Sequence, residues 1–156
     1  MESVLFEETQ RLSPLIILAI VAAVLVVFGL VLWRTGGGLS RPVWMLLGGT
    51  VVFLATLVAM SRMHTEVTPD SVDISMFYLI SESIPHADIS EFQVLEYQPL
   101  REFGGWGLRY GPSGRAYSMS GSEGVRLVLQ DGSQITLGSQ NAEVLAAAIE
   151  TGKATP

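Results

Sequence analysis

Two long apolar runs without an ionisable side chain limit this chain more than any other feature. They extend over residues 12–33 and 42–61 of the 156. A helix that rises 1.5 Å per residue needs about 20 such residues to cross the roughly 30 Å hydrocarbon core of a bilayer. Both runs reach this length. The sequence therefore predicts two transmembrane helices within residues 12–61, followed by a water-facing domain.

The link over residues 34–41 predicts that the two helices form an antiparallel hairpin. It contains three consecutive glycines and is followed by Pro42, a composition that favours a turn over a continued helix. Because neither run carries Asp, Glu, Lys, Arg or His, a transporter or pump is disfavoured. Thr50 and Thr56 are expected to hydrogen-bond to the backbone of their own helix.

Residues 1–11 are predicted to be an N-terminal tail that frays, with a short interfacial helix as the alternative. The acidic start differs from the basic start of a cleavable signal peptide. The positive-inside comparison sets Arg34 and Arg41 in the link against Arg11 and Arg62 on the other side, and the count is a tie. Two spans nevertheless place the N-terminus and the domain on the same side of the membrane.

From Thr65 onward, apolar and polar residues alternate with a period of two, which predicts β-strands. The clearest local unit is a hairpin around Asp131-Gly132, because this dipeptide favours a two-residue turn. An amphipathic helix over about residues 142–150, capped by Asn141 and stopped by Gly152, is expected to close the domain. A short tail, residues 152–156, follows. The predicted strands cover 65–67, 72–76, 77–84, 89–97, 126–129 and 134–137.

Residues 101–124 combine seven glycines with four aromatic residues, and four arginines lie within or beside this stretch. A phosphate-binding loop is excluded because the glycines neither open a helix nor precede a Gly-Lys-Ser/Thr sequence. The glycines are expected to form bulges and tight corners between short strands. The candidate interaction surface consists of the arginine and aromatic side chains of this region: Arg101, Phe103, Trp106, Arg109, Tyr110, Arg115, Tyr117 and Arg126.

Several motifs in a fixed order carry a resemblance to a known family. They are YQPLREFGGW, GLRYG, GRAY, SGSEGV and LxDGSxITLGSQ, followed by a closing helix. Together they resemble small bacterial membrane proteins that place a pleckstrin-homology-like (PH-like) domain after two transmembrane helices. The resemblance implies a mainly-β domain over residues 62–151, a bent seven-stranded barrel capped by a C-terminal α-helix. It also implies the bacterial inner membrane, with the N-terminus and the domain in the cytoplasm. It does not imply a reaction.

Catalysis is disfavoured by what the sequence lacks. His64 and His86 are the only histidines, and neither has a carboxylate or nucleophile partner that the sequence reveals. The chain contains no HExxH or GxSxG motif, and without cysteine it has no thiolate metal site. The sequence therefore predicts no catalytic residue, no cofactor and no metal ion.

The leading hypothesis is a membrane-held interaction module that binds a protein partner or its own copy. Exposed aromatic side chains and a sheet edge near the glycines are suited to such binding. The alternative is a lipid-headgroup module, because guanidinium groups bind phosphate well.

Charge argues against the lipid-headgroup alternative. From Arg62 onward, six Lys and Arg residues oppose twelve Asp and Glu residues, a net charge of −6 that an anionic leaflet repels. The arginines are expected to be solvated or to pair with Glu91, Glu96 and Glu102. The same acidic balance disfavours nucleic acid as a partner.

Overall fold

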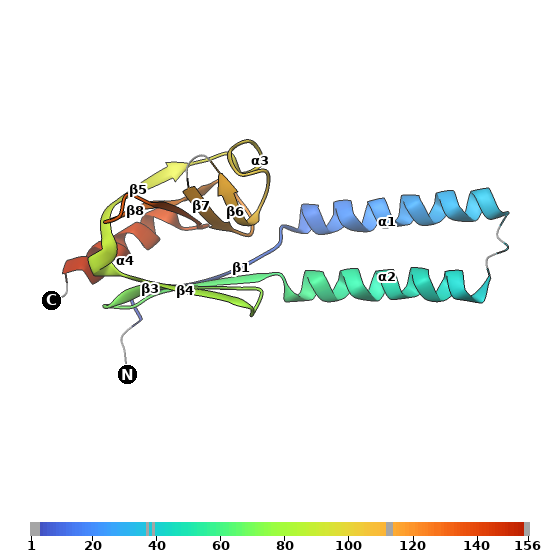
Figure 1. Ribbon diagram of the computed structural model, residues 1–156, viewed down its shortest axis with the longest axis horizontal. Helices are drawn as coiled ribbons and strands as arrows, with labels where there is room; N and C mark the ends of the chain where they lie inside the picture. Colours follow the sequence, from blue (N-terminus) through green and yellow to red (C-terminus); the bar gives the residue numbers. More distant parts are fainter. Residues whose placement is uncertain (1–3, 37, 39, 112–113, 155–156) are drawn as a thin grey trace. The chain divides into compact units, whose positions relative to one another are not determined.

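The computed structural model describes residues 4–36, 38, 40–111 and 114–154, which form two compact units (Figure 1). The first unit is a helical hairpin, residues 12–61. The second is a β-rich domain that combines the described residues from Arg62 onward with those before Leu12. Two helices and a β-sheet-rich domain agree with the predicted fold class at this coarse level.

The hairpin consists of α1 (Pro14–Thr35) and α2 (Arg41–Met60). Each helix has a proline in its first turn. Backbone N–H groups in the first turn have no acceptor within the helix, so a proline there removes no helical hydrogen bond. Thr50 and Thr56 donate their hydroxyls to carbonyl oxygens four residues earlier, at 2.9 Å each, which confirms the prediction for both. Both helices are long and apolar enough to span a membrane.

The N-terminal segment forms a strand, so the prediction of a frayed tail is wrong. β1 (Phe6–Arg11) pairs antiparallel with β2 (Arg62–Val67), the first strand after the hairpin, and Arg11 lies opposite Arg62. Because the partner strand comes only after both helices, the local pattern of residues 1–11 does not reveal the pairing. The helical hairpin is therefore inserted between two neighbouring strands of one sheet.

Two polar side chains fix β1 to the rest of the domain. Gln10 is 1% exposed; its Nε2 donates to Gly138 O at 2.7 Å, and its Oε1 accepts from Met119 N at 3.4 Å. The carboxylate of Glu8 accepts from Gln140 N at 2.9 Å, just before the C-terminal helix. Buried polar groups that form hydrogen bonds with one another hold the elements that carry them in one arrangement. β1 is thus an integral part of the domain.

The first sheet has four strands in the order β1-β2-β3-β4, with β3 (Ser71–Met76) and β4 (Ile80–Pro85). The predicted strand over residues 77–84 is wrong in its first three residues, because the chain reverses there and Met76 faces Ile80. Phe77 and Tyr78 have positive φ angles of 55° and 58°. Aromatic residues usually favour strands, so the residue types at these positions do not reveal the turn.

Among the described residues, the second sheet has five strands in the order β5-β8-β9-β7-β6, and only the β7–β9 pair is parallel. Pairing of β8 with β9 across Asp131-Gly132 confirms the predicted hairpin. The connections include two short helical turns, η1 (His86–Asp88) and α3 (Pro99–Glu102). The strands are β5 (Ile89–Glu96), β6 (Gly107–Gly111), β7 (Gly114–Ser118), β8 (Glu123–Leu129) and β9 (Gln134–Gly138).

One hydrophobic core joins both sheets to the C-terminal helix α4 (Ala142–Ala154), which packs against strands of each sheet (Figure 1). The described residues contain nine strands where six or seven were predicted, because β1 and the strands of the glycine-rich stretch were missed. Four outer strands, β1, β4, β5 and β6, end the two sheets. The core includes Met63, Val67, Ile74, Met76, Val125, Leu127, Ile135, Leu137, Leu145 and Ile149.

The predicted helix stop at Gly152 is wrong, because α4 continues through it to Ala154. Gly152 packs directly against the ring of His86, which is 6% exposed. A Cβ at this position would overlap Nε2 of that ring. The glycine therefore allows α4 and η1 to approach each other closely, which the sequence pattern alone does not show.

Candidate interaction surface

The glycine-rich stretch forms α3, β6, β7 and the start of β8, and β6 is the outermost strand of the five-stranded sheet. A sheet edge near the glycines, as predicted, is therefore present. Alternate residues of an edge strand turn their N–H and C=O groups away from the neighbouring strand. Among the described residues, no strand pairs with this outer side of β6.

Two of the eight predicted surface residues are buried and belong to the interior. Phe103 is 6% exposed and Tyr117 is 2% exposed. Phe103 contacts Tyr97 edge-on, with ring centroids 6.1 Å apart, and these rings pack with Ala116 in a small second cluster. Phe103 and Tyr117 therefore stabilise the fold instead of offering a surface.

A third residue, Arg115, pairs across the two sheets with Glu82 of β4. Its guanidinium nitrogens lie 2.9 Å and 3.2 Å from the two carboxylate oxygens. The Tyr117 hydroxyl donates to the same carboxylate. β4 is an outer strand, and an inward-pointing charged residue on such a strand opposes edge-to-edge association. The Arg115–Glu82–Tyr117 cluster thus links β4 to β7 of the other sheet.

The cluster also changes the acidity of the tyrosine. Burial of the phenol, followed by its hydrogen bond to the Glu82 carboxylate, raises the pKa of Tyr117 from 10.0 to about 12. Both effects disfavour the phenolate, because an anion would be desolvated and would lie beside another anion. Arg115 opposes this shift only in part.

This shift predicts a loss of stability at high pH. Below about pH 10 the phenol is protonated in both the folded and the unfolded chain, so its contribution is fully present. Between about pH 10 and 12 only the unfolded chain ionises, and the free energy of unfolding falls by on the order of 2 kcal/mol.

Ultraviolet titration of tyrosinate tests the assignment of this pKa. The titration curve of the Tyr117→Phe chain should lack the last ionisation step, and the curve of the Tyr110→Phe control should keep it. Loss of the same step in both variants would contradict the assignment.

Arg126 also forms an ion pair within the domain. Its Nη2 lies 3.8 Å from Oε2 of Glu102, which confirms the predicted pairing with that glutamate, and its Nε is buried. Glu82, the partner of Arg115, was missed because it lies in a different sheet and no local pattern links the two residues. No ion pair of an arginine with Glu91 or Glu96 is described among residues 4–36, 38, 40–111 and 114–154.

Four of the eight residues remain at the surface, on α3, β6 and the segment between them. Arg109 and Tyr110 are exposed on β6, and Tyr110 is 73% exposed. Trp106 is half-buried; its Nε1 donates to Gly121 O at 3.0 Å, and its carbonyl accepts from Arg109 Nε at 3.1 Å. Arg101 is exposed on α3. We call this set the β6 rim: Arg101, Trp106, Arg109 and Tyr110.

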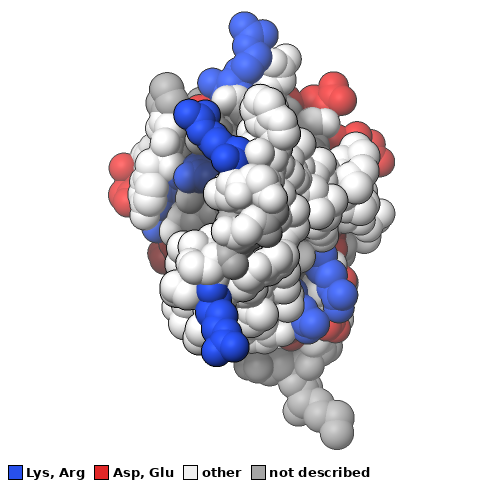
Figure 2. Space-filling model, turned by 90° about the vertical axis from the view of Figure 1, so that its right-hand side faces the viewer, with Lys and Arg blue, Asp and Glu red and all other residues white. Residues whose placement is uncertain are grey.

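The four arginines of the predicted surface lie on four different elements, α3, β6, β7 and β8. On the one face that Figure 2 draws, the lysine and arginine side chains form separate groups. An extended anionic surface binds best to a contiguous basic patch. Arg115 and Arg126 also form ion pairs with glutamates, so the predicted arginines give little support to a domain that binds lipid headgroups through many arginines at once.

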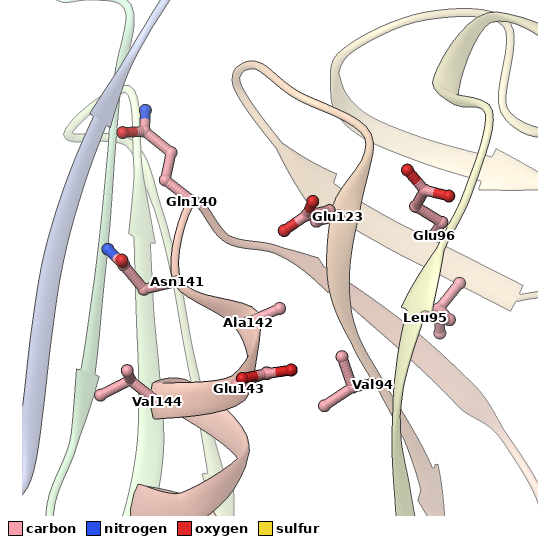
Figure 3. Close-up of a pocket in the computed structure, with 9 residues that line it drawn as sticks. All are labelled: Val94, Leu95, Glu96, Glu123, Gln140, Asn141, Ala142, Glu143 and Val144. Carbon is pink, nitrogen blue, oxygen red and sulfur yellow. The ribbon is translucent and has the colours of Figure 1, made fainter.

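A cavity of about 430 Å³ lies between α4 and the paired ends of β5 and β8 (Figure 3). Carboxylates from all three elements line it, and Glu96 lies opposite Glu123 in the strand register, with Glu143 on the helix. Such a lining repels phosphate and other anions. In the described part of the chain, no group of three or more His, Cys, Asp or Glu side chains is arranged to hold a metal ion.

The prediction that neither histidine has a carboxylate partner is wrong for His64. Its Nε2 lies 3.7 Å from Glu66 and 4.0 Å from Glu7, and its Nδ1 lies 3.1 Å from the Thr9 hydroxyl. These residues are near neighbours in the β1–β2 register, on a solvent-exposed strand face. Ordinary strand pairing accounts for the grouping. His86 is instead buried, with Nε2 2.8 Å from Thr68 O.

No protein-family model, curated protein or solved structure matches this chain.

Proposed function

We propose that this protein is a membrane-anchored, non-catalytic interaction module of PH-like fold that binds a protein partner through the β6 rim. In this proposal α1 and α2 cross the bacterial inner membrane, and the β-rich domain and the N-terminus lie in the cytoplasm. The length and apolar composition of both helices support the anchoring role. Insertion of the hairpin between β1 and β2 supports a common side for the N-terminus and the domain.

The order of elements supports the PH-like part of the proposal. A four-stranded sheet is followed by a five-stranded sheet and then by the C-terminal helix α4. This order agrees with a bent β structure covered by a closing helix, the architecture that the sequence resemblance implies. The nine described strands and the four outer strands differ from a closed seven-stranded barrel.

The observation that carries the proposal is the unpaired outer side of β6 beside two exposed side chains. An extended segment of another protein can add to such an edge, with main-chain hydrogen bonds giving affinity and side chains giving specificity. Tyr110 offers a large amphipathic contact, and Arg109 offers charge on a domain that is acidic elsewhere. An extended segment with acidic side chains is the partner chemistry that fits this edge best.

Lipid-headgroup binding through the predicted arginines is the weaker alternative. Arg115 and Arg126 contact Glu82 and Glu102, so their charges are already neutralised within the domain. Only Arg101 and Arg109 of the predicted arginines remain exposed without a carboxylate contact among the described residues. Two such charges give a weak attraction to an anionic leaflet.

Photo-crosslinking from the β6 rim tests the proposal in cells. A benzophenone amino acid at position 110 should give a discrete crosslinked product, whereas the same group at Val94, on the opposite outer strand β5, should not. A product of twice the 16.8 kDa chain would identify a second copy as the partner. Equal crosslinking from both positions, or none from position 110, would refute binding at β6.

A substitution complements the crosslinking. Arg109→Ala should lower the crosslinked yield about tenfold, because truncation of a central contact residue often costs 1–2 kcal/mol of binding. The free energy of unfolding should change by no more than about 1 kcal/mol, since the side chain is exposed and loses a single hydrogen bond, to the Trp106 carbonyl. Gln93→Ala on β5 is the matched control and should change neither quantity.

A further inference from the structure

An exposed apolar turn joins β3 to β4, over Phe77, Tyr78 and Leu79. Leu79 is 83% exposed, the highest value of any large apolar side chain in the described part of the chain, and Tyr78 is 66% exposed. Phe77 packs against the core and holds the turn in place. Apolar side chains presented in this way commonly mark a surface that binds an apolar partner.

The backbone of this turn is unusual for its residues. Phe77 and Tyr78 are the non-glycine residues with positive φ in the described part of the chain. Tight hairpin turns of this conformation normally use Asn and Gly, because a bulky side chain is disfavoured there. A turn that keeps two aromatic residues in a disfavoured conformation, and exposes one of them beside a leucine, points to a functional role.

The turn lies beside the point where the chain leaves α2. The Phe77 N–H donates to the carbonyl oxygen of Arg62 at 2.9 Å. Arg62 begins β2 and follows Met60, the last residue of α2, after a single intervening serine. Two residues span at most about 7 Å, and the polar layer on each side of a bilayer is roughly 5–8 Å thick. With α2 crossing the membrane, the chain length places Arg62 and the turn within that layer.

Two arginines lie on neighbouring strands at the same end of the sheet. Arg11 lies opposite Arg62 in the β1–β2 register, and both side chains are exposed. Neither has a carboxylate contact among the described residues. The Arg62 guanidinium lies 5.9 Å from the centre of the Tyr78 ring. Like charges opposite one another repel in water, whereas lipid phosphates bind guanidinium groups and stabilise such a pair.

We propose that Arg11, Arg62, Tyr78 and Leu79 form an interfacial anchor that binds the lipid surface around the hairpin. Tyr78 and Leu79 enter the boundary between headgroups and acyl chains, where amphipathic aromatic residues are favoured. The two arginines bind phosphodiester groups of the lipids. The proposal rests on the membrane-spanning role of α1 and α2, and it adds a lipid contact that fixes the orientation of the domain.

Labelling of the full chain tests the interfacial anchor. The sequence has no cysteine, so Leu79→Cys gives a unique site for an environment-sensitive fluorophore. Asp70→Cys is the matched control, because it is exposed in the turn at the other end of β3, about 17–20 Å away. Leu18→Cys in α1 reports whether the hairpin is in the bilayer. The three labelled chains are compared in vesicles of equal parts phosphatidylcholine and phosphatidylglycerol.

The expected result is quenching of the Leu79 label by spin-labelled lipid and its protection from aqueous iodide. The Asp70 label should show the reverse. If iodide reaches both labels equally while spin-labelled lipid quenches the Leu18 label, the interfacial anchor is refuted and the hairpin role stands. If lipid fails to quench the Leu18 label, the membrane-spanning role and the anchor both fail.

The arginine part of the proposal has its own test in the labelled Leu79→Cys chain. Combined Arg11→Gln and Arg62→Gln substitutions should reduce lipid quenching of the label, because the phosphate contacts are lost. The charge-preserving pair Arg11→Lys and Arg62→Lys should retain most of it. Unchanged quenching in the glutamine chain would refute a role for the arginines in binding phosphate.

Discussion

A chain in which an Asn-Gly turn replaces residues 12–61 is expected to fold as a water-soluble domain. Arg11 and Arg62 are directly opposite each other in the antiparallel β1–β2 pair, so a two-residue turn can connect the two strands. The hydrophobic core lies within the β-rich domain and includes no residue of the hairpin. The soluble chain should therefore unfold in one cooperative transition, followed by circular dichroism during thermal denaturation.

The matched control begins at Arg62 and lacks β1. It loses the pairing of six residues, the buried contacts of Gln10 and the contacts of Glu8. At about 1 kcal/mol for each hydrogen bond, this loss approaches the 5–15 kcal/mol by which a typical domain is stable. The control should aggregate or remain unfolded. Equal stability of the two chains would show that β1 is dispensable.

The Gly114→Ala substitution is expected to destabilise the protein by about 2–6 kcal/mol. Gly114 has a φ of 89°, which costs a residue with a Cβ about 1–3 kcal/mol. Its added Cβ would also overlap the backbone oxygen of Gln134 on β9. Relief of that overlap requires β7 and β9 to separate, and overpacking of this kind adds roughly 1–3 kcal/mol.

Gly132→Ala is the control that separates the two effects at Gly114. Gly132 has a similar φ of 81°, but an added Cβ meets nothing within 4 Å. This control should cost only the backbone contribution, about 1–3 kcal/mol, and therefore less than Gly114→Ala. Urea unfolding of the soluble chain measures both variants. If the two variants lose equal stability, the close approach of β7 and β9 is not the reason why position 114 requires glycine.

Local patterns predicted the elements whose partners are close in sequence. The β8–β9 hairpin has its turn at Asp131-Gly132 between two apolar runs, and the alternation around it specifies the pairing. The start of α4 and the two apolar helices were predicted for the same reason. In each case, the residues that determine the structure lie within about one element length.

The elements that were missed depend on distant contacts. β1 is a strand because β2 pairs with it across the inserted hairpin, and Gln10 is satisfied by Gly138 and Met119 from the far end of the chain. α4 continues through Gly152, where the absence of a side chain leaves room for the ring of His86. The turn at Phe77 contradicts the preference of its residues for strands. The residues on either side of these positions therefore do not predict any of these contacts.

The candidate surface was predicted as a region, but its eight side chains have different roles. Composition alone does not distinguish a buried Tyr117 from an exposed Tyr110, since both lie in strands of the same hairpin. The distinction follows from the four-stranded sheet, whose strand β4 brings Glu82 to Arg115 and Tyr117. The edge position of β6 is also a consequence of strand order, which the sequence does not specify.

Membrane topology is the most direct test of the central claim, that α1 and α2 cross the membrane and hold the domain on one face. Ser40→Cys in the link and Asp70→Cys in the domain are exposed positions in an otherwise cysteine-free chain. A membrane-impermeant maleimide should label Ser40→Cys in intact bacterial cells and label Asp70→Cys only after the inner membrane is permeabilised. Labelling of both positions in intact cells, or of neither until permeabilisation, would contradict a membrane-spanning hairpin.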